Sequence, residues 1–288
     1  MTSPRIYVPT PRIIPTPPVI PVEAVLPAPL VLPAPLVIPA QAGIHGSIEL
    51  GKEHLRYVKS VLRMKKGDPL TLFDGTGWEY ETVITRISAD GIAVDVVHKR
   101  RAPEESLHVT LMQSLPKANK MDFIVQKATE LGAHRIVSFQ SARSVPRLSP
   151  EKAASRTARW QSIAVEAARQ CGRADVPKIC GMGSFEEVLS MAEQDTLKLI
   201  FWEEESKRGV KQALREPQYA GVRNLAVIIG PEGGFTKEEV SSAAEKGFLS
   251  VSLGRQVLKV ETAVVTILSI IQYEKGFFGG ISKEGQTS

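Results

Sequence analysis

The sequence predicts an α/β protein in which a small β-rich domain precedes a larger domain built on a parallel sheet. Residues 47–103 contain short β patterns separated by turn signals, which indicate the first domain. Residues 104–276 alternate short apolar runs with helical patterns, and this rhythm is typical of a parallel sheet covered by helices. A glycine-rich hexapeptide, residues 230–235, follows one of the apolar runs directly and marks the end of a strand.

Residues 9–42 stand apart because proline dominates them. Twelve of the twenty prolines lie in the first 46 residues, and Val25–Leu30 is repeated unchanged as Val31–Leu36. This density of proline excludes a helix, so the tract is not a membrane span, and polyproline II or disorder is expected. Ala40–Ala42 imitates a cleavage site, which leaves a processed export signal as one alternative. A translated repeat without function is another.

The β-rich domain is predicted from one hairpin and one further strand. Leu70–Asp74 and Trp78–Ile87 have strand patterns, and Gly75–Gly77 between them supplies the turn. Gly91–Val97 is the next expected strand. Small, basic β-barrels of this kind often bind RNA.

In the larger domain, apolar runs and capping signals predict the elements in order. The expected strands are 107–113, 135–139, 197–202, 224–229 and 249–253. The expected helices are 119–131, a long one with Ser149 as N-cap and Pro150 at its first position, one opened by the capping box Ser184–Glu187, 236–247 and 261–273.

The loop Gly230–Phe235 lies between a buried strand and the capping box Thr236–Glu239. Its glycines are therefore expected at the carboxyl end of a parallel strand, where open α/β sheets bind their ligands. Glycine there lets the backbone approach a flat ligand, because no Cβ intervenes. A plain strand-to-helix turn is the alternative. The segment Leu253–Ala263 has the same layout, since a strand ends at Gly254 and a short loop enters an apolar helix.

Together these two elements resemble the SPOUT class of S-adenosylmethionine-dependent RNA methyltransferases, and within it the ribosomal small-subunit methyltransferase E family. Members carry Gly-Pro-Glu-Gly-Gly after one strand and a leucine-glycine, leucine-arginine and glutamate-threonine-alanine pattern after the next. Lys259 stands where arginine is usual, so the charge is kept but the planar guanidinium fork is lost. Four further blocks match in the family's order, so that the likeness covers residues 47–275: His54–Arg63, Gly67–Gly75, Ser114–Gly132 and Arg159–Arg173.

The resemblance implies a PUA-like RNA-binding β-barrel at 47–103, a SPOUT (α/β knot) methyltransferase domain at 104–276 and a flexible tail at 277–288. It also implies that residues 1–46 hold a first strand at Arg5–Val8, followed by the proline tract as an insertion. The implied activity is S-adenosylmethionine-dependent methylation of N3 of a specific uridine in 16S rRNA. Neither GxGxxG nor a Walker sequence follows any expected strand, which argues against the classical nucleotide-binding folds.

The expected S-adenosylmethionine site consists of segments at three neighbouring strand ends. Its predicted residues are Phe201, Trp202, Gly230, Pro231, Glu232, Gly233, Gly234, Leu253, Gly254, Val257, Leu258, Thr262 and Ala263. A valine at Gly233 is expected to exclude the cofactor sterically while leaving the fold intact. No metal is expected, since the five histidines are scattered and the two cysteines lack ligand spacing.

Methylation of N3 requires donor and acceptor to be aligned and the imide proton to be removed. The predicted proton acceptors are Glu232, inside the glycine loop, and Glu261, at the start of the last helix. An acid in the first turn of a helix is stabilised by the helix dipole in any case, which is the alternative for Glu261. Arg173 is predicted to stabilise the developing uridine anion.

The charge distribution indicates a polyanionic partner. Residues 99–173 hold fourteen Lys and Arg against six Asp and Glu, whereas the whole chain has a net charge of +5. The resemblance implies that this partner is 16S rRNA, within an assembled small ribosomal subunit. The predicted RNA contacts are Arg63, Lys117, Lys120, Arg143 and Arg173. For each of them, an ordinary solvated surface residue is the alternative.

The last helix predicts a homodimer, because apolar residues surround it on nearly all sides: Val264, Val265, Ile267, Leu268, Ile270 and Ile271. The resemblance implies that such helices pair across a two-fold axis beside the cofactor. A helix buried wholly within its own subunit is the alternative.

Two other functions remain compatible with the sequence. One is a SPOUT-type ribose 2′-O-methyltransferase acting on rRNA or tRNA, and the other is a non-catalytic RNA-binding assembly factor. The intact glycine loop and the Glu261–Ala263 element argue against the second. Two cysteines without a disulfide framework and the absence of a membrane span predict a cytoplasmic protein.

Overall fold

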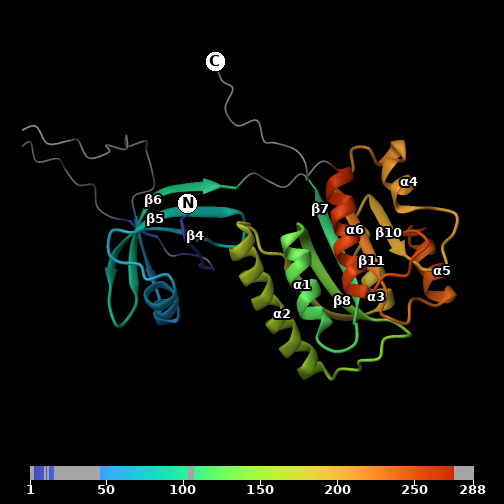
Figure 1. Cartoon of the computed structure of the whole chain (residues 1–288), viewed down its shortest axis with the longest axis horizontal. Helices are drawn as coiled ribbons and strands as arrows, with labels where there is room; N and C mark the ends of the chain where they lie inside the picture. The colour runs from blue at the N-terminus through green and yellow to red at the C-terminus, as the bar shows by residue number, and fades with distance from the viewer. Residues whose placement is uncertain (1–2, 10, 12, 16–45, 103–106, 276–288) are drawn as a thin grey trace, which may run out of the picture. The chain divides into compact units, whose positions relative to one another are not determined.

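The structure, a computed structural model, describes residues 3–9, 11, 13–15, 46–102 and 107–275. The chain divides into two compact units, residues 1–103 and 104–288 (Figure 1). Most of the proline tract, residues 16–42, and the expected C-terminal tail lie outside the described residues.

The first unit is a six-stranded sheet with two short helical turns, at Lys52–His54 and Tyr57–Val61. The sheet order is β1-β4-β5-β6-β3-β2, and β1 pairs with β4 in parallel while the other pairs are antiparallel. The strands are β1 Arg5–Tyr7, β2 Ile14–Pro15, β3 Gly46–Leu50, β4 Pro69–Phe73, β5 Trp78–Ile87 and β6 Ile92–Arg101. The hairpin and the first strand are therefore where the sequence predicted them.

The β4–β5 turn is fixed by one side chain and two glycines. Asp74 accepts hydrogen bonds from the backbone N–H and the hydroxyl of Thr76, both at 2.8 Å. Gly75 and Gly77 have φ of 79° and 96°, a left-handed conformation that favours glycine. The strands bury one apolar cluster, which includes Leu72 and Ile84.

The second unit alternates strands and helices. Its strands are β7 His108–Ser114, β8 Ala133–Gln140, β9 Lys178–Ser184, β10 Leu197–Phe201, β11 Asn224–Ile229 and β12 Leu249–Val251. Its helices are α1 Lys120–Glu130, α2 Pro150–Cys171, α3 Phe185–Ser190, α4 Val210–Arg215, α5 Lys237–Glu245 and α6 Val260–Glu274, with a further turn at Pro217–Tyr219.

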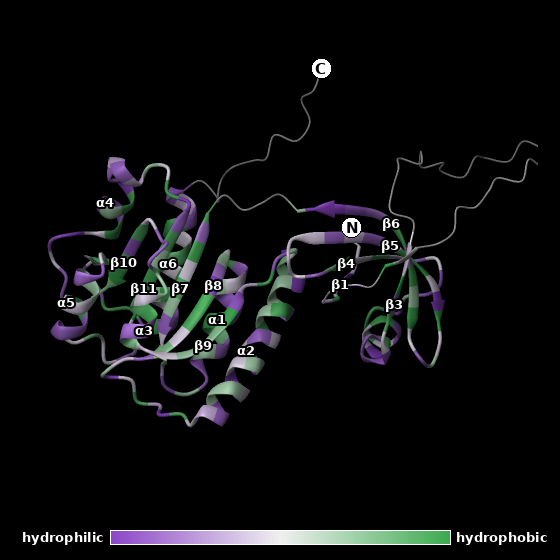
Figure 2. Cartoon of the chain, turned by 180° about the vertical axis from the view of Figure 1, so that it is seen from behind, coloured by the Kyte–Doolittle hydropathy of each residue, from purple (hydrophilic) through white to green (hydrophobic). Residues whose placement is uncertain are grey.

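All strand pairs of this sheet are parallel, in the order β12-β10-β11-β7-β8-β9. One face buries α1, α2, α4 and α6, and the other buries α3 and α5, as Figures 1 and 2 show. Alternate residues of a strand serve the two faces, so that Leu111 of β7 packs in the first cluster and Met112 in the second. The predicted doubly covered parallel sheet is confirmed, while the knot stays a prediction from the resemblance.

The capping signals act as the sequence predicted. The Ser149 side chain accepts a hydrogen bond from the backbone of Lys152, with Pro150 at the first helical position of α2. Reciprocal capping boxes open α3 at Ser184 and α5 at Thr236. Strand β9 and helix α4 were not predicted, because their short sequences lack a clear periodicity and β9 contains two glycines.

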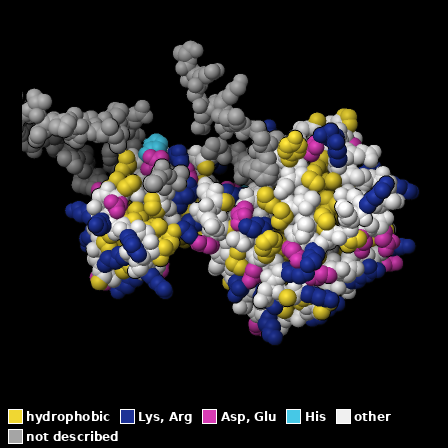
Figure 3. Space-filling model, in the orientation of Figure 1, with side chains coloured by type: hydrophobic (Ala, Val, Ile, Leu, Met, Phe, Trp, Pro, Cys, Tyr) yellow, Lys and Arg dark blue, Asp and Glu magenta, His cyan; other side chains and the backbone are white. Residues whose placement is uncertain are grey.

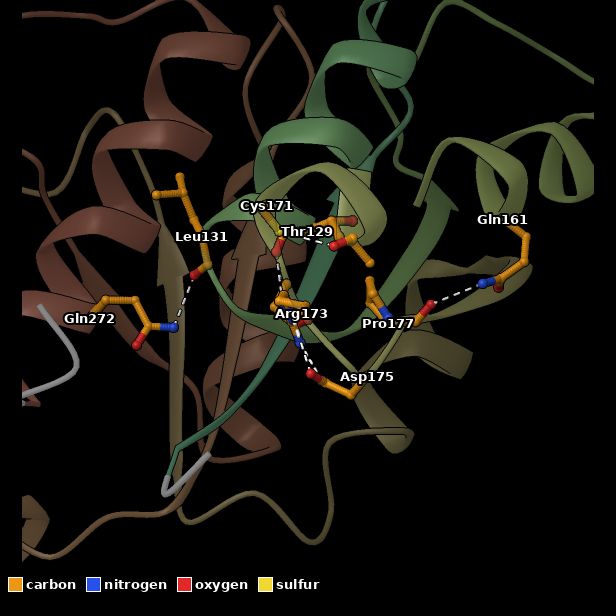
Figure 4. A network of polar contacts seen from close by, with 10 residues as sticks. Thr129, Leu131, Gln161, Cys171, Arg173, Asp175, Pro177 and Gln272 are labelled. Atoms are coloured by element: carbon orange, nitrogen blue, oxygen red, sulfur yellow. Dashed lines mark hydrogen bonds and ion pairs between the residues drawn. The ribbon is translucent and has the colours of Figure 1, made fainter. Parts of the chain in front are cut away.

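Helix α6 is buried on one face only. Val264, Ile267, Leu268 and Ile271 are fully buried, and the side-chain amide of Gln272 donates to the carbonyl oxygen of Leu131 at 2.9 Å (Figure 4). A second stripe is half-buried or exposed and contains Thr262, Val265, Thr266, Ser269, Ile270 and Tyr273. This exposed stripe excludes the alternative of a helix buried wholly within its own subunit, and the homodimer stays a prediction.

Arg173 follows α2 and lies where the strands of the sheet begin. Its guanidinium donates to the carbonyl oxygens of Thr129, at 2.7 Å, and Ala133, at 3.1 Å, and it forms an ion pair with Asp175 (Figure 4). Ala133 pairs with Val109, near the start of β7. The other end of β7 is roughly 20 Å away, at about 3.3 Å per residue.

The side chain of Arg173 is only 9% exposed. Through these hydrogen bonds the buried side chain links the end of α1 to the start of β8. This link lies at the edge of the sheet opposite the strand carboxyl ends. The predictions that it contacts RNA and stabilises a uridine anion are therefore wrong. The contacts that Arg173 makes within the protein explain why it stands in a segment that resembles the family's second helix.

Replacing Arg173 by alanine is expected to lower the free energy of unfolding by about 2–3 kcal/mol, because the carbonyl oxygens of Thr129 and Ala133 lose a charged donor and Asp175 loses its ion-pair partner. Urea unfolding followed by circular dichroism measures this free energy. Arg147→Ala removes an exposed arginine that is bonded to Gln140, and it should change the free energy of unfolding by less than about 0.5 kcal/mol. Equal effects of the two variants would contradict the structural role of Arg173.

Candidate functional site

A pocket of about 390 Å³ opens at the carboxyl ends of β10, β11 and β12. These three strands are neighbours in the sheet, in the order β12-β10-β11. Its walls come from the segments that follow the three strands and from the first turns of α1 and α6: Lys120, 201–203, 229–232, Gly234, 251–260 and Ala263. The sequence thus correctly predicted which three strand ends meet.

The glycine loop after β11 is shaped by packing within the protein. A Cβ on Gly230 would approach the ring of Phe235 to 3.1 Å. Gly234 has φ of +67°, and a Cβ there would lie 1.7 Å from a carboxylate oxygen of Glu203. Glycine is therefore required at 234 by backbone conformation and at 230 by the aromatic ring beneath it.

Gly233 faces away from the pocket wall. A Cβ at this position would lie 3.1 Å from the Cβ of Arg143, whose guanidinium donates to the carbonyl oxygen of Gly233 at 2.9 Å. The expectation that a valine at Gly233 acts by steric exclusion of a ligand is therefore wrong, because the added side chain would press on the neighbouring loop. Thr262, also predicted for the pocket, is exposed on α6 and does not line it.

Two buried side chains, Gln113 and Glu239, hold the loops that follow β11 and β8. The amide of Gln113, at the end of β7, donates to the carbonyl oxygens of Ile229, at 3.4 Å, and Gly230, at 3.3 Å. The carboxylate of Glu239 accepts from the backbone N–H of Ala142 at 2.7 Å and thereby ties α5 to the loop after β8. Gln113 belongs to no motif, so no sequence signal pointed to it, whereas Glu239 was predicted only as part of the capping box Thr236–Glu239.

The opposite wall is the segment that follows β12. Gly254, with φ of +124°, turns the chain, and its N–H donates to the hydroxyl of Ser252 at 3.1 Å. Leu253 and Leu258 are partly buried in the core, whereas Val257 is 84% exposed. This segment thus presents backbone groups and alternating apolar side chains to the pocket.

Three charged side chains from three elements meet beside the pocket: Lys120 and Glu232 line it, whereas Glu261 does not. The ammonium of Lys120, the first residue of α1, lies 2.9 Å from Oε1 of Glu232 and 3.3 Å from Oε2 of Glu261. The backbone N–H of Lys117 donates to both carboxylate oxygens of Glu232, at 3.1 Å each. The cluster joins the starts of α1 and α6 to the glycine loop.

These contacts shift the pKa values of Glu232 and Lys120. Burial alone would raise the pKa of Glu232, but hydrogen bonds from the Lys120 ammonium and from backbone N–H groups outweigh it and lower that pKa. The hydrogen bond to Glu232, supported by Glu261, raises the pKa of Lys120. Glu232 is therefore a weaker base than an ordinary glutamate, and Lys120 a persistent cation.

The other predicted residues are placed as follows. Phe201, Trp202, Gly230, Pro231, Glu232, Gly234, Leu253, Gly254, Val257, Leu258 and Ala263 line the pocket. Lys117 and Arg143 are exposed beside the glycine loop, and Arg63 is exposed in the first unit with φ of +55°. Arg255 and Gln256, within the predicted segment Leu253–Leu258, line the pocket as well. Glu203 also lines it and was not predicted, because it follows a strand end without a motif of its own.

Among the described residues, no group of three or more His, Cys, Asp or Glu side chains could hold a metal ion. Within the same part of the chain, no helix combines the length and the apolar character needed to cross a membrane.

Comparison with known proteins agrees with this architecture. The family described as an RNA methyltransferase domain matches residues 103–272, and the RNA methyltransferase PUA domain matches residues 50–97. Ribosomal RNA small subunit methyltransferase E of Bacillus subtilis strain 168 is 33% identical over 231 residues, covering 79% of this chain and 90% of the relative. The enzyme of that name from Buchnera aphidicola (subspecies Acyrthosiphon pisum, strain APS) is 32% identical over 231 residues, covering 80% of this chain and 88% of the relative.

Solved structures give the same result. The crystal structure of a ribosomal RNA small subunit methyltransferase E from Neisseria gonorrhoeae bound to S-adenosyl methionine matches with a TM-score of 0.73 and 30% identity. The match covers 84% of this chain and 97% of that one. With a domain match over more than half of its residues and relatives this similar over most of its length, the chain belongs to the ribosomal RNA small subunit methyltransferase E family.

Proposed function

We propose that the protein methylates N3 of a specific uridine in 16S rRNA with S-adenosylmethionine as donor. The observation that carries the proposal is the pocket in which the three predicted strand ends converge. Family membership supports methyl transfer to ribosomal RNA, and the bound donor in the Neisseria structure supports its identity. The choice of N3 of uridine rests on the resemblance described above.

The pocket suits the proposed donor in size and in chemistry. A volume of about 390 Å³ lies within the usual range for small-ligand sites. Apolar side chains of Phe201, Leu253 and Leu258 offer contacts for a flat base, between backbone groups of the two loops. Trp202 also lines the pocket, and its indole N–H is buried without a hydrogen-bond partner among the described residues.

S-adenosylmethionine supplies a methyl carbon bonded to a positively charged sulfur, which accepts the bonding electrons when the carbon is transferred. The protein's own contribution is to hold this donor and the acceptor base in line. The glycine loop, fixed by Gln113, and the Leu253–Leu258 segment provide rigid walls for that purpose. Glu232, which lines the pocket, and Glu261, beside it at the start of α6, are the proposed proton acceptors, and the lowered pKa of Glu232 makes it a weaker base than an ordinary glutamate.

Each unit has proposed RNA contacts of its own. The PUA domain of the first unit contributes Arg63, and the second contributes Lys117, Lys120 and Arg143 near the pocket. Figure 3 shows Lys and Arg side chains across the visible faces of both units, interspersed with acidic ones. Such exposed cations favour phosphate contacts, which supply most of the sequence-independent affinity for RNA. The proposed location is the cytoplasm, where this substrate is found.

A homodimer is part of the proposal. In the second stripe of α6, Val265 and Ile270 are half-buried, and Phe123 on the neighbouring α1 is 44% exposed. An apolar stripe beside the pocket entrance fits a second copy of the chain, in a self-complementary two-fold contact. The stripe begins at Thr262, one residue after Glu261, so such a contact would lie beside the charged cluster.

The proposed activity is tested on small ribosomal subunits from a strain that lacks the gene. Purified protein and labelled S-adenosylmethionine should methylate their 16S rRNA, and mass spectrometry of nucleosides should show 3-methyluridine at one position. A 2′-O-methylated nucleoside would instead identify a ribose methyltransferase. RNA binding without any methyl incorporation would identify an assembly factor.

Gly234→Ala is expected to weaken S-adenosylmethionine binding about tenfold (~1.4 kcal/mol). The new side chain strains a left-handed backbone and displaces the Glu203 carboxylate, which lines the pocket. Gly233→Ala is the matched control, because its Cβ would meet Arg143 outside the pocket, and it should change affinity less than about threefold. Isothermal titration calorimetry compares them, and a larger loss in Gly233→Ala would overturn this assignment.

Val265→Asp should convert a dimer to a monomer at micromolar concentration, as measured by light scattering. Burying an unpaired carboxylate at the contact is expected to raise the dimer dissociation constant by at least about 100-fold. Val145→Asp places the same substitution at a residue that is 61% exposed on the loop after β8, and it should leave the dimer intact. A monomeric mass for the unaltered protein would refute the dimer itself.

A further inference from the structure

Lys120 occupies a position that helix energetics disfavour for a cation. It is the first residue of α1, where the helix dipole presents its positive end. The preceding turn is also strained, because Ala118, a residue with a Cβ, has φ of +55°. Asn119, at the N-cap, makes no capping hydrogen bond with its side chain. A local arrangement that breaks several rules of helix initiation is typical of a functional site.

Two carboxylates compensate for this placement and aim the ammonium at the pocket. Glu232 and Glu261 lie 2.9 Å and 3.3 Å from Nζ, and the side chain of Lys120 is 32% exposed. The two other cations that line the pocket, Arg255 and Lys259, are exposed on the far loop. Lys120 is thus the pocket cation that neighbouring groups hold in a fixed position.

Loss of the N3 proton leaves a negative charge that spreads from N3 to the two carbonyl oxygens of the uracil ring. A fixed ammonium near one of these oxygens stabilises this anion more than the neutral base. We propose that Lys120 is a catalytic residue that donates a hydrogen bond to a uracil carbonyl oxygen and stabilises the N3 anion, while Glu232 and Glu261 hold its ammonium in place. This proposal rests on the proposed function and assigns Lys120 a role beyond phosphate contact.

The proton balance is simple. The N3–H bond breaks, the proton passes to Glu261 or to solvent water, and its bonding electrons remain on the ring for attack on the methyl carbon. Lys120 keeps its own protons throughout, which agrees with its raised pKa. The charged groups that face it are Glu232 from the glycine loop and Glu261 from α6, with Glu203, Arg255 and Lys259 elsewhere on the pocket wall.

The first test is the pH dependence of single-turnover methylation of small ribosomal subunits. Lys120→Gln should lower the rate about 100-fold at neutral pH, and the deficit should shrink at alkaline pH, where uracil ionises without help. Lys120→Arg keeps the charge and should retain most of the rate. Lys127→Gln removes another α1 lysine, paired with Glu130 away from the pocket, and should leave the profile unchanged.

The second test does not depend on methyl transfer. An rRNA fragment carrying 5-fluorouridine at the mapped target is bound to the protein with S-adenosylhomocysteine, and its N3 ionisation is followed by fluorine NMR. The unaltered protein should lower the pKa of this base relative to the free fragment, and Lys120→Gln should abolish that shift.

The outcomes distinguish the proposed function from the proposed role of Lys120. Failure of the unaltered protein to methylate N3 would remove the proposed function. Normal methylation, combined with an equal rate loss in Lys120→Gln at every pH and an unchanged fluorouridine pKa, would show that Lys120 only braces Glu232 and Glu261. That combination would overturn the catalytic role of Lys120 and leave the proposed function standing.

Discussion

The geometry of a parallel sheet is the constraint on which the rest of this structure depends. When β11, β10 and β12 lie side by side and run in one direction, their carboxyl ends meet at one edge. Three loops far apart in the sequence then share a pocket, although no single loop could enclose a ligand. Two of the helices that pack on the first face, α1 and α6, begin at this same edge and bring their first residues to it.

The charged cluster is a consequence of that convergence. Glu261 at the start of α6 is favoured by the helix dipole, whereas Lys120 at the start of α1 is opposed by it. Each becomes stable through the other and through Glu232, which also accepts two backbone hydrogen bonds. The protein thereby keeps a cation and two anions at fixed positions in a pocket with apolar walls, where electrostatic interactions are stronger than in water.

The sequence predicted the elements and the pocket edge well, because strand ends, capping boxes and glycine loops are local signals. It could not predict which way a side chain points once a loop folds. Gly233 faces Arg143, and Arg173 is buried at the opposite edge of the sheet, although both stand in segments that resemble the family. The role of Gln113 could not be predicted for the same reason, since it depends on contact with a loop more than a hundred residues away.

The central claim is that the three strand ends form one donor site, and hydrogen exchange measured by mass spectrometry tests it most directly. Adding S-adenosylmethionine should slow amide exchange in residues 201–203, 230–234 and 253–259 together. The opposite edge, around Ala133 and Asp175, should exchange as before. Protection confined to one of the three segments, or found instead at the opposite edge, would contradict the account.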